Sequence, residues 1–422
     1  MKKKLILHIL FLLLMGSVVS AQIPPPFEML KPYADSMYFY AGLRKLQQYK
    51  ATYVVESEPT YYQALATFYT FNGLLDSAII AMDKSTQGEL ISHEREADTS
   101  NLSGYTAVGA RQYILNEVGK YRALMIDGAH HVPQHRFFVK SLLQELYSKG
   151  FRYLCIDDLK YDPIWFLKSQ DLRVPYLANE GYYTREPYFG ELIREAARIG
   201  YTVRGYTPEE YCSAAERDSL MANNIYRIMG GDNPRAKVLV LSGLEQMEKS
   251  APASLYNNLQ KHYGLNALTV SQTEFYEHSS SYYESPYYIA FTRHFQINTP
   301  SVLLDSTGAL YRLGNDLADI SIYSPRVSYT HGKPDWLLEE GARKRIPVKP
   351  NRKTVWIKAY HASETTIKKP TPERFFIPVD QLIVDRNMNG GKYHLMLPQG
   401  IFLIQYLDEK GKRVKEYYYQ NK

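Results

Sequence analysis

Apolar and polar residues follow two different periods through the middle of the chain. Residues 121–126 are almost continuously apolar, which is the pattern of a buried strand. Pro133 stands where a helix begins, because the first residue of a helix needs no N–H partner. Apolar residues then recur at helical spacing over 137–147, Gly150 ends the helix, and 151–156 is a second apolar strand. The pattern predicts a strand–helix–strand unit.

The same alternation continues through the following residues. Helices are expected over residues 191–199 and 208–229, and further strands over 201–204, 237–243, 267–270 and 301–304. Strands and helices that alternate at these lengths favour a mainly parallel sheet with helices on both faces. We therefore predict an α/β domain over residues 120–346.

The segments on either side of this domain have different patterns. Residues 22–119 are expected to form a helical segment, in which 61–83 resembles one tetratricopeptide-like hairpin. A single repeat cannot stack into a solenoid, so we expect a helical cap packed on the α/β domain, followed by a polar loop over residues 85–109. Short alternating runs separated by Gly, Pro and Asn turns predict a small antiparallel β-sandwich over residues 347–422.

The N-terminus predicts export. Residues 1–21 combine three lysines, an apolar run and a small-residue end, which is the pattern of a secretory signal peptide, and the apolar run is too short to span a membrane. We therefore expect a periplasmic or extracellular protein with no transmembrane segment after cleavage. Loss of the three lysines lowers the formal charge from +6 to +3, so a nucleic-acid partner is not indicated.

Titratable residues gather where the predicted strands end. Asp127, His130, His131 and His135 follow the first strand, and Asp157 follows the second. Ligands of open α/β sheets bind outside the carboxyl ends of the strands, so this edge is the expected site. Two adjacent histidines cannot easily face one pocket, and a histidine at a helix start points along the surface in most arrangements. We therefore place His130 in the site and leave His131 and His135 outside it.

The sequence of this region resembles one protein superfamily. Its phrases are Met125-Ile-Asp-Gly-Ala-His-His-Val-Pro-Gln-His-Arg136, Leu142-Leu-x-x-Leu146 and Gly150-Phe-Arg-Tyr-Leu-Cys-Ile-Asp157. They resemble the erythromycin esterases, the ChaN-like haem-binding proteins and the TraB/GumN/Tiki-type metalloproteases. Further phrases of the same kind are Thr184-Arg-Glu-Pro-x-Phe-Gly190, Arg217-x-x-x-Met-Ala222 and Lys333-Pro-Asp-Trp-Leu337.

Several positions depart from the pattern of that superfamily. There, a Gly-Glu-x-His or Asn-Glu-x-His segment follows the first strand, a glutamate ends the second, and a Gly-x-x-His phrase follows a later strand. Here His130 matches the first histidine. Gly128 and Asp157 stand in place of the two glutamates, and Glu245 and Gln246 stand where the last histidine is expected. The resemblance implies a divergent member with a degenerate active site.

The predicted site comprises His130, Asp157, Glu186, Arg217 and Glu245. His130 and Asp157 are the candidate metal ligands, and Asp157 is alternatively a general base or the group that orients His130. Three of these five residues also have a purely structural explanation. Asp157 could cap a turn, Glu186 could stabilise the positive end of a helix, and Arg217 could form a surface salt bridge.

Two classes of function follow. The first is a hydrolase of an ester or a peptide, with or without the assistance of a metal. The second is a binding protein that has lost catalysis and holds haem, another ligand or a protein partner through its terminal domains. The sequence does not identify the cofactor, for which a divalent metal and haem are the two candidates. In both classes the expected ligand is a small molecule or a peptide.

Overall fold

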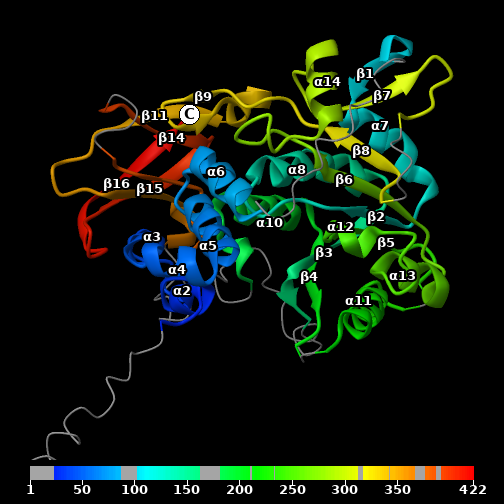
Figure 1. Cartoon of the computed structure of the whole chain (residues 1–422), viewed down its shortest axis with the longest axis horizontal. Coiled ribbons are helices and arrows are strands. Elements are labelled where there is room, and N and C mark those ends of the chain that lie inside the picture. Colours follow the sequence, from blue (N-terminus) through cyan, green and yellow to red (C-terminus); the bar gives the residue numbers. More distant parts are fainter. Residues whose placement is uncertain are drawn as a thin grey trace, which may run out of the picture.

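The computed structural model describes residues 23–86, 102–161, 181–209, 212–231, 233–311, 317–341, 343–365, 376–385 and 391–422. It confirms a mixed α/β fold: N-terminal helices, an eight-stranded and mainly parallel sheet, and small antiparallel sheets at the C-terminus (Figure 1). The predicted signal peptide lies outside the described residues. No helix in the described ranges is long and apolar enough to cross a membrane.

The central sheet has one topological switch point. Its strands, in spatial order, are β1 (Tyr105–Gly109), β7 (Ser301–Asp305), β8 (Ile320–Tyr323), β6 (Ala267–Phe275), β2 (Ala123–Ile126), β5 (Lys237–Leu241), β3 (Phe151–Lys160) and β4 (Thr202–Thr207). The six strands from β8 to β4 pair in parallel, whereas β7 is antiparallel to both of its neighbours. Because β2 lies between β5 and β6, the carboxyl ends of these two strands flank that of β2, and the end of β3 lies beyond that of β5.

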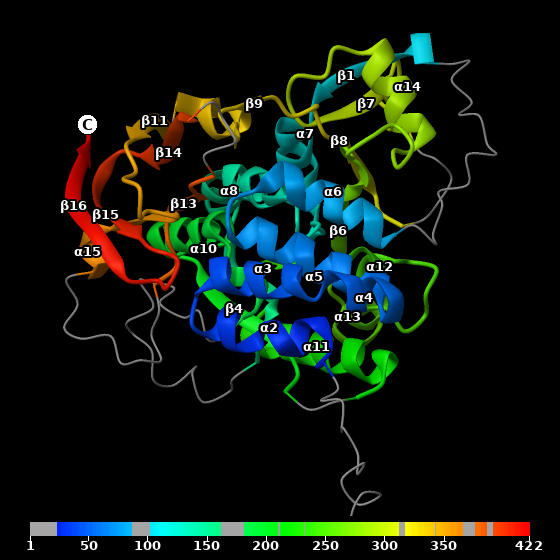
Figure 2. The same ribbon diagram turned by 60° about the vertical axis from the view of Figure 1, so that its left-hand side comes forward.

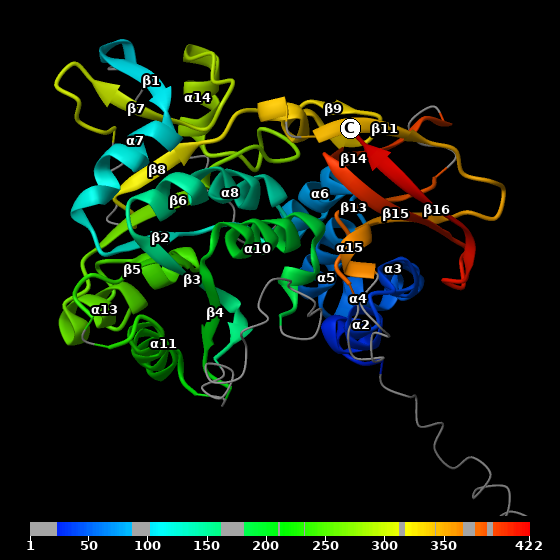
Figure 3. The ribbon, with the colours of Figure 1, turned by 180° about the vertical axis from the view of Figure 1, so that it is seen from behind.

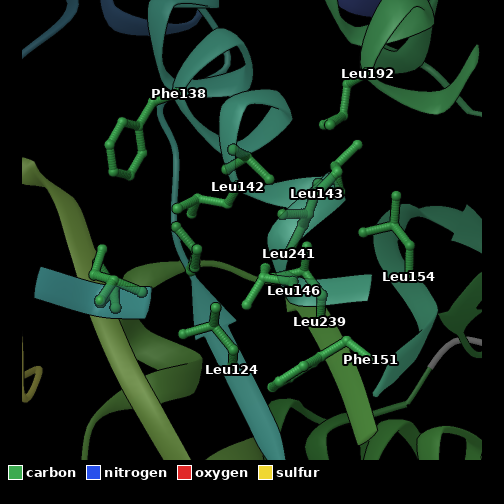
Figure 4. Packing of buried hydrophobic residues seen from close by; sticks show 14 of the residues in the cluster. Leu124, Phe138, Leu142, Leu143, Leu146, Phe151, Leu154, Leu192, Leu239 and Leu241 are labelled. Carbon is green, nitrogen blue, oxygen red and sulfur yellow. The ribbon is translucent and has the colours of Figure 1, made fainter. Parts of the chain in front are cut away.

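Helices cover both faces of this sheet, as the sequence predicts (Figure 3). One face carries α7 (Ala110–Glu117), α8 (Pro133–Ser148) and α10 (Pro187–Ile199), and the other carries α11 (Ala214–Ile228), α12 (Leu244–Met247) and α13 (Leu255–Tyr263). Alternate residues of β2 belong to the two cores: Leu124 packs with Leu142 of α8, and Met125 packs on the other side (Figure 4). Burial on both faces explains why the strand has no polar residue.

The N-terminal helices lie against both the α/β domain and the C-terminal strands (Figures 1 and 2). They are α2 (Pro26–Asp35), α3 (Phe39–Gln48), α4 (Lys50–Glu56), α5 (Glu58–Phe71) and α6 (Leu75–Ser85). The α5–α6 hairpin turns at Gly73, whose positive φ of 76° suits glycine. The core of these helices includes Trp356 and Ile377, His278 Nδ1 lies 2.6 Å from Asp83 Oδ1, and an ion pair joins Asp35 to Arg185. The helical segment therefore packs on both neighbouring parts rather than on the α/β domain alone.

The C-terminal strands form small antiparallel sheets around one core. β11 (Arg343–Val348) pairs with β14 (Tyr393–Pro398), and the second sheet has the order β13 (Asp380–Ile383), β12 (Trp356–His361), β15 (Gly400–Leu407) and β16 (Arg413–Asn421). Smaller elements before and within this part are α14 (Pro286–His294), β9 (Tyr329–Thr330), β10 (Lys333–Pro334), η4 (Asp335–Gly341) and α15 (Ala362–Thr365). β11 spans position 347, where the sequence places the boundary of the last domain.

The prediction of a polar loop over residues 85–109 is wrong at the C-terminal end of that range. Residues 105–109 form β1, which pairs with β7 from Tyr105 opposite Asp305 to Gly109 opposite Ser301. This strand alternates between partly buried and exposed positions, so its sequence carries no continuous apolar run. Residues 87–101 lie outside the described ranges.

Candidate functional site

A small cavity opens at the carboxyl ends of β2, β3, β5 and β6, where the sequence places the site. Its volume is about 30 Å³, which is room for a water molecule but not for an organic ligand. The lining residues come from the strand ends and from α8 and α10: Ile126, Asp127, Gly128, His130, His135, Arg136, Val139, Asp157, Phe189, Leu241, Ser242 and Gln272. Of the five predicted site residues, His130 and Asp157 line this cavity together.

His130 lies at the exposed side of the cavity. Its ring stacks on Tyr183 of η3 (Tyr183–Arg185), with 3.6 Å between ring centroids and 5° between ring planes. Arg136 Nη2 lies 3.2 Å from His130 Nδ1. Because a guanidinium only donates hydrogen bonds, Nδ1 is the acceptor, and the neutral ring carries its proton on Nε2. His130 is thus an oriented N–H donor.

Asp157 and Asp158 have different surroundings, although they are neighbours on β3. Asp158 accepts the amide hydrogens of Tyr182 at 3.0 Å and of Thr184 at 2.7 Å, so it holds the chain that enters α10. The Asp157 carboxylate faces the cavity. Burial, and next the charge of Asp158, raise the pKa of Asp157 to about 7, while Arg136 opposes the shift. Asp157 can therefore accept and release a proton near neutral pH.

The expectation that His135 points along the surface is wrong. Only 2% of its surface is exposed, because Tyr276 packs edge-on against its ring at 5.6 Å between centroids. The backbone N–H of Ala129 donates to His135 Nδ1 at 3.1 Å, so the proton of the neutral ring is on Nε2. Burial, and next the charge of Arg136, hold the pKa of His135 well below its usual range, so the ring stays neutral.

Two buried polar atoms of the cavity lining have no hydrogen-bond partner among the described residues: His135 Nε2 and Ser242 Oγ. Ser242 directly follows β5, is 5% exposed, and donates its backbone N–H to the carbonyl of Ile126 at 3.1 Å. Unpartnered buried polar atoms are costly, and they occur most often where a ligand or a water binds. The sequence analysis leaves His135 outside the site, which is wrong, and does not consider Ser242. The one available signal for Ser242 is its place at the end of a buried strand.

Asp127 has a structural role at the end of β2. Its carboxylate accepts hydrogen bonds from the backbone of Gln272 at 2.5 Å, from Ser271 Oγ at 3.0 Å and from the hydroxyl of Thr273. Burial nevertheless raises its pKa to about 6. Asp127 therefore joins β2 to β6. His131, as expected, does not line the cavity: it is buried, and its Nε2 lies 3.5 Å from the hydroxyl of Tyr276.

Glu186 lies behind the cavity wall and caps α10. Its carboxylate oxygens accept the backbone N–H groups of Tyr188 at 2.9 Å and Phe189 at 2.8 Å. This is the helix-capping explanation that the sequence left open. Burial raises the pKa of Glu186 to about 7, and the two amides and Arg136 oppose the shift. Arg136 is buried and donates to the carbonyls of Ala129 and Val132, so its charge is fixed beside the cavity.

The structure does not bring Glu245 and Arg217 to the cavity. Glu245 is exposed on α12 and does not line the cavity. Arg217 Nε lies 3.4 Å from Asp218 Oδ1, and 43% of the Arg217 side chain is exposed. Arg217 thus forms the surface salt bridge that was its structural explanation. Gln246, which stands near the histidine position of the resemblance, accepts the N–H of Gly243 at 3.0 Å.

The described residues that line and surround this cavity do not fit a resident metal or haem. In the part of the chain that the structure describes, no group of three or more His, Cys, Asp or Glu side chains is placed to hold a metal ion. The oxygens of Asp127, Asp158 and Glu186 already accept hydrogen bonds, and His130 Nδ1 faces a cation. The cavity is also far below the roughly 300 Å³ at which sites for organic ligands begin.

Comparison with known proteins adds distant structural likenesses. No model of a protein family matches the chain, and no curated protein matches its sequence. The type III effector HopBA1 is similar over 51% of this chain and 94% of its own, with 10% identity and a TM-score of 0.32. RRSP, a MARTX toxin effector domain from Vibrio vulnificus, matches 50% of this chain and 45% of its own, with 14% identity and a TM-score of 0.28.

The C-terminal region of Pasteurella multocida toxin, described as having a thiol-protease-like catalytic triad, shows a similarly weak likeness. It matches 63% of this chain and 34% of its own, with 14% identity and a TM-score of 0.28. This chain thus spans less than half of the length of either toxin structure. Likenesses at these scores assign no activity.

Proposed function

We propose that the protein is an exported hydrolase of an ester or a peptide, in which Asp157 is the general base and a water held in the cavity is the nucleophile. We also propose that it is a distant relative of the erythromycin esterases and TraB-like proteins. In that case His130 and Asp157 correspond to the histidine after the first strand and the carboxylate after the second strand of those proteins. One observation carries the proposal. An aspartate with a pKa near 7 faces the same water-sized cavity as two buried polar atoms that have no partner in the described part of the chain.

The geometry supports a defined role for each group. A water in the cavity accepts a hydrogen bond from His135 Nε2–H, bonds to Ser242 Oγ, and donates to the Asp157 carboxylate. As the water oxygen attacks the carbonyl carbon, its proton passes to Asp157. The protonated Asp157 then returns this proton to the departing alcohol or amine, so that the carboxylate is restored at the end of the cycle.

His130 is suited to the carbonyl oxygen of the substrate. It lies at the exposed side of the cavity, where a substrate arrives, and Arg136 and Tyr183 fix its ring. Its Nε2–H can donate to the oxygen on which negative charge develops, and the nearby Arg136 charge favours that oxygen. The mechanism needs no step through a metal.

The proposal is tested with full-length mature protein and a panel of chromogenic esters and fluorogenic peptides. We expect the rate to rise with pH through about 7, as Asp157 loses its proton, and to survive dialysis against EDTA. Asp157→Asn should lower kcat by roughly 10²–10⁴-fold with little change in KM. Glu245→Gln is the matched control, because Glu245 is an exposed carboxylate outside the cavity, and it should leave kcat unchanged. Full activity of Asp157→Asn would refute the role of Asp157.

A second function has an observation of its own. Asp127, Asp158 and Glu186 each use their carboxylates in structural hydrogen bonds, as in a protein that keeps its scaffold without its chemistry. Such a protein binds a ligand and hydrolyses nothing. Wild-type protein that is inert toward every ester and peptide in the panel supports this alternative over the hydrolase.

A further inference from the structure

A second cleft lies away from the strand-end cavity and is much larger, at about 450 Å³. This volume lies in the range of roughly 300–1,000 Å³ that is usual for small-molecule sites. The cleft is lined by residues from the start of α8, the end of α14, the segment after β8, and η4. Of these, α14 lies at the top of Figure 1, as does β9, which follows the segment after β8. Its lining residues are Gln134, Thr292, Phe295, Gln296, Ile297, Asn298, Pro325, Arg326, Val327, Ser328, Asp335, Trp336 and Glu339.

The charged groups of the cleft are already engaged. Arg326 makes a two-point ion pair with the buried Glu284, at 2.7 and 2.9 Å. Asp335 forms an ion pair with Arg345, and Glu339 also interacts with another part of the chain. A charged ligand would have to compete with these pairs. The cleft therefore favours a ligand without net charge.

Three side-chain amides supply the hydrogen-bonding capacity of the cleft. Gln134, Gln296 and Asn298 line it, and none of these amides bonds to another residue in the described ranges. Gln134 is 8% exposed, and its amide has no partner among the described residues. Each amide offers two donor hydrogens and an acceptor oxygen, which matches a ligand whose groups both donate and accept.

Aromatic rings supply the apolar part of the same walls. Trp336 is 5% exposed and is held by Phe137 and Tyr188, at 5.1 and 5.5 Å between ring centroids. Phe295, directly after α14, is only partly buried, so it is the ring that a ligand can cover. A rigid ring of this kind binds the apolar face of a ligand at little cost in conformational entropy. A sugar ring has such a C–H face together with hydroxyls that donate and accept.

We propose that this cleft binds a neutral oligosaccharide. The ligand's sugar hydroxyls pair with the three amides, and one sugar face packs on an aromatic wall. A peptide fits less well, because no lining residue lies in a strand whose edge could pair with a peptide backbone. The proposal rests on residues that the hydrolase proposal does not use, so either can fail alone.

The test is calorimetric titration of the full mature chain with cellotetraose, maltotetraose and chitotetraose. We expect at least one to bind, and Gln296→Ala/Asn298→Ala to raise its Kd by at least about tenfold, since two hydrogen-bonding amides are lost. Both positions are exposed, so the double variant should fold. Gln134→Ala should weaken binding as well, and Gln63→Ala, an exposed glutamine on α5 outside the cleft, should not.

Three results would overturn the proposal. The first is that none of the neutral tetrasaccharides binds. The second is that binding persists unchanged in variants at all three amide positions. The third is that tetragalacturonate or an unstructured peptide binds in the cleft and the neutral sugars do not. Melting temperatures of the variants ensure that a loss of binding is not a loss of folding.

Discussion

Replacement of Asp157 by asparagine should stabilise the protein at alkaline pH while it removes the proposed base. The pKa of this carboxyl is about 7 in the folded protein and 3.8 in an ordinary setting, because burial and Asp158 oppose its charge. Between these two pH values the folded state binds a proton that the unfolded chain has lost. Stability from this group is therefore full below about pH 4 and is lost as the pH rises to about 7.

The size of the effect follows from the same two values. They differ by about 3, and each pKa unit corresponds to about 1.4 kcal/mol, so charging Asp157 in the folded protein costs at most about 4 kcal/mol. Asparagine carries no charge but brings an amide that must be accommodated, at a cost of about 1–2 kcal/mol. We expect a net gain of about 2 kcal/mol at pH 8 and less at pH 5.

Urea unfolding of wild type and Asp157→Asn at pH 5 and pH 8 measures this difference. Asp158→Asn is the matched control, because Asp158 accepts two backbone amides and its loss should lower stability at both pH values. If Asp157→Asn is no more stable relative to wild type at pH 8 than at pH 5, the carboxyl is not held against its charge. Asp157 is then not a base poised near pH 7.

Four other substitutions have distinct expected outcomes. His130→Ala should leave the melting temperature nearly unchanged, because the ring is exposed, and should lower kcat/KM of the hydrolase. His135→Ala should cost about 2–3 kcal/mol in urea unfolding, since it removes a buried ring and the acceptor for the Ala129 amide. Glu186→Gln should lose about 1 kcal/mol at pH 5 through the weaker α10 cap, and less at pH 8, where it also removes a buried charge, with kcat unchanged. Ser242→Ala should lower kcat about tenfold with little change in melting, since its hydroxyl has no partner among the described residues.

The part of the fold that could be predicted from the sequence is the part whose signal is local. β2, α8 and β3 were found because strands buried on both faces read as apolar runs and α8 shows helical spacing. β1 and β8 were missed. β1 is held in place by its pairing with β7, about two hundred residues later. Its side chains are at most partly buried, so its sequence shows no apolar run. Long-range pairing of this kind has no local signal.

The candidate site divides in the same way. His130 and Asp157 were placed correctly at the strand ends, because the end of a strand can be read from the sequence. The hydrogen bonds that Ser271 and Gln272 donate to the Asp127 carboxylate could not be predicted, because the donors lie about 145 positions away in the sequence. His135 was misjudged for a related reason: Tyr276, which covers it, follows a distant strand.

The placement of the N-terminal helices has a consequence for how the chain folds. Their core needs Trp356 and Ile377, while Lys358 donates to the carbonyl of Met37 at 3.0 Å and Gln381 donates to that of Phe71. The first helices to be synthesised thus remain without their packing partners until almost the whole chain exists. Such non-local contacts slow folding and leave apolar surface exposed in the interim. Nascent or C-terminally truncated chains should therefore depend on chaperones.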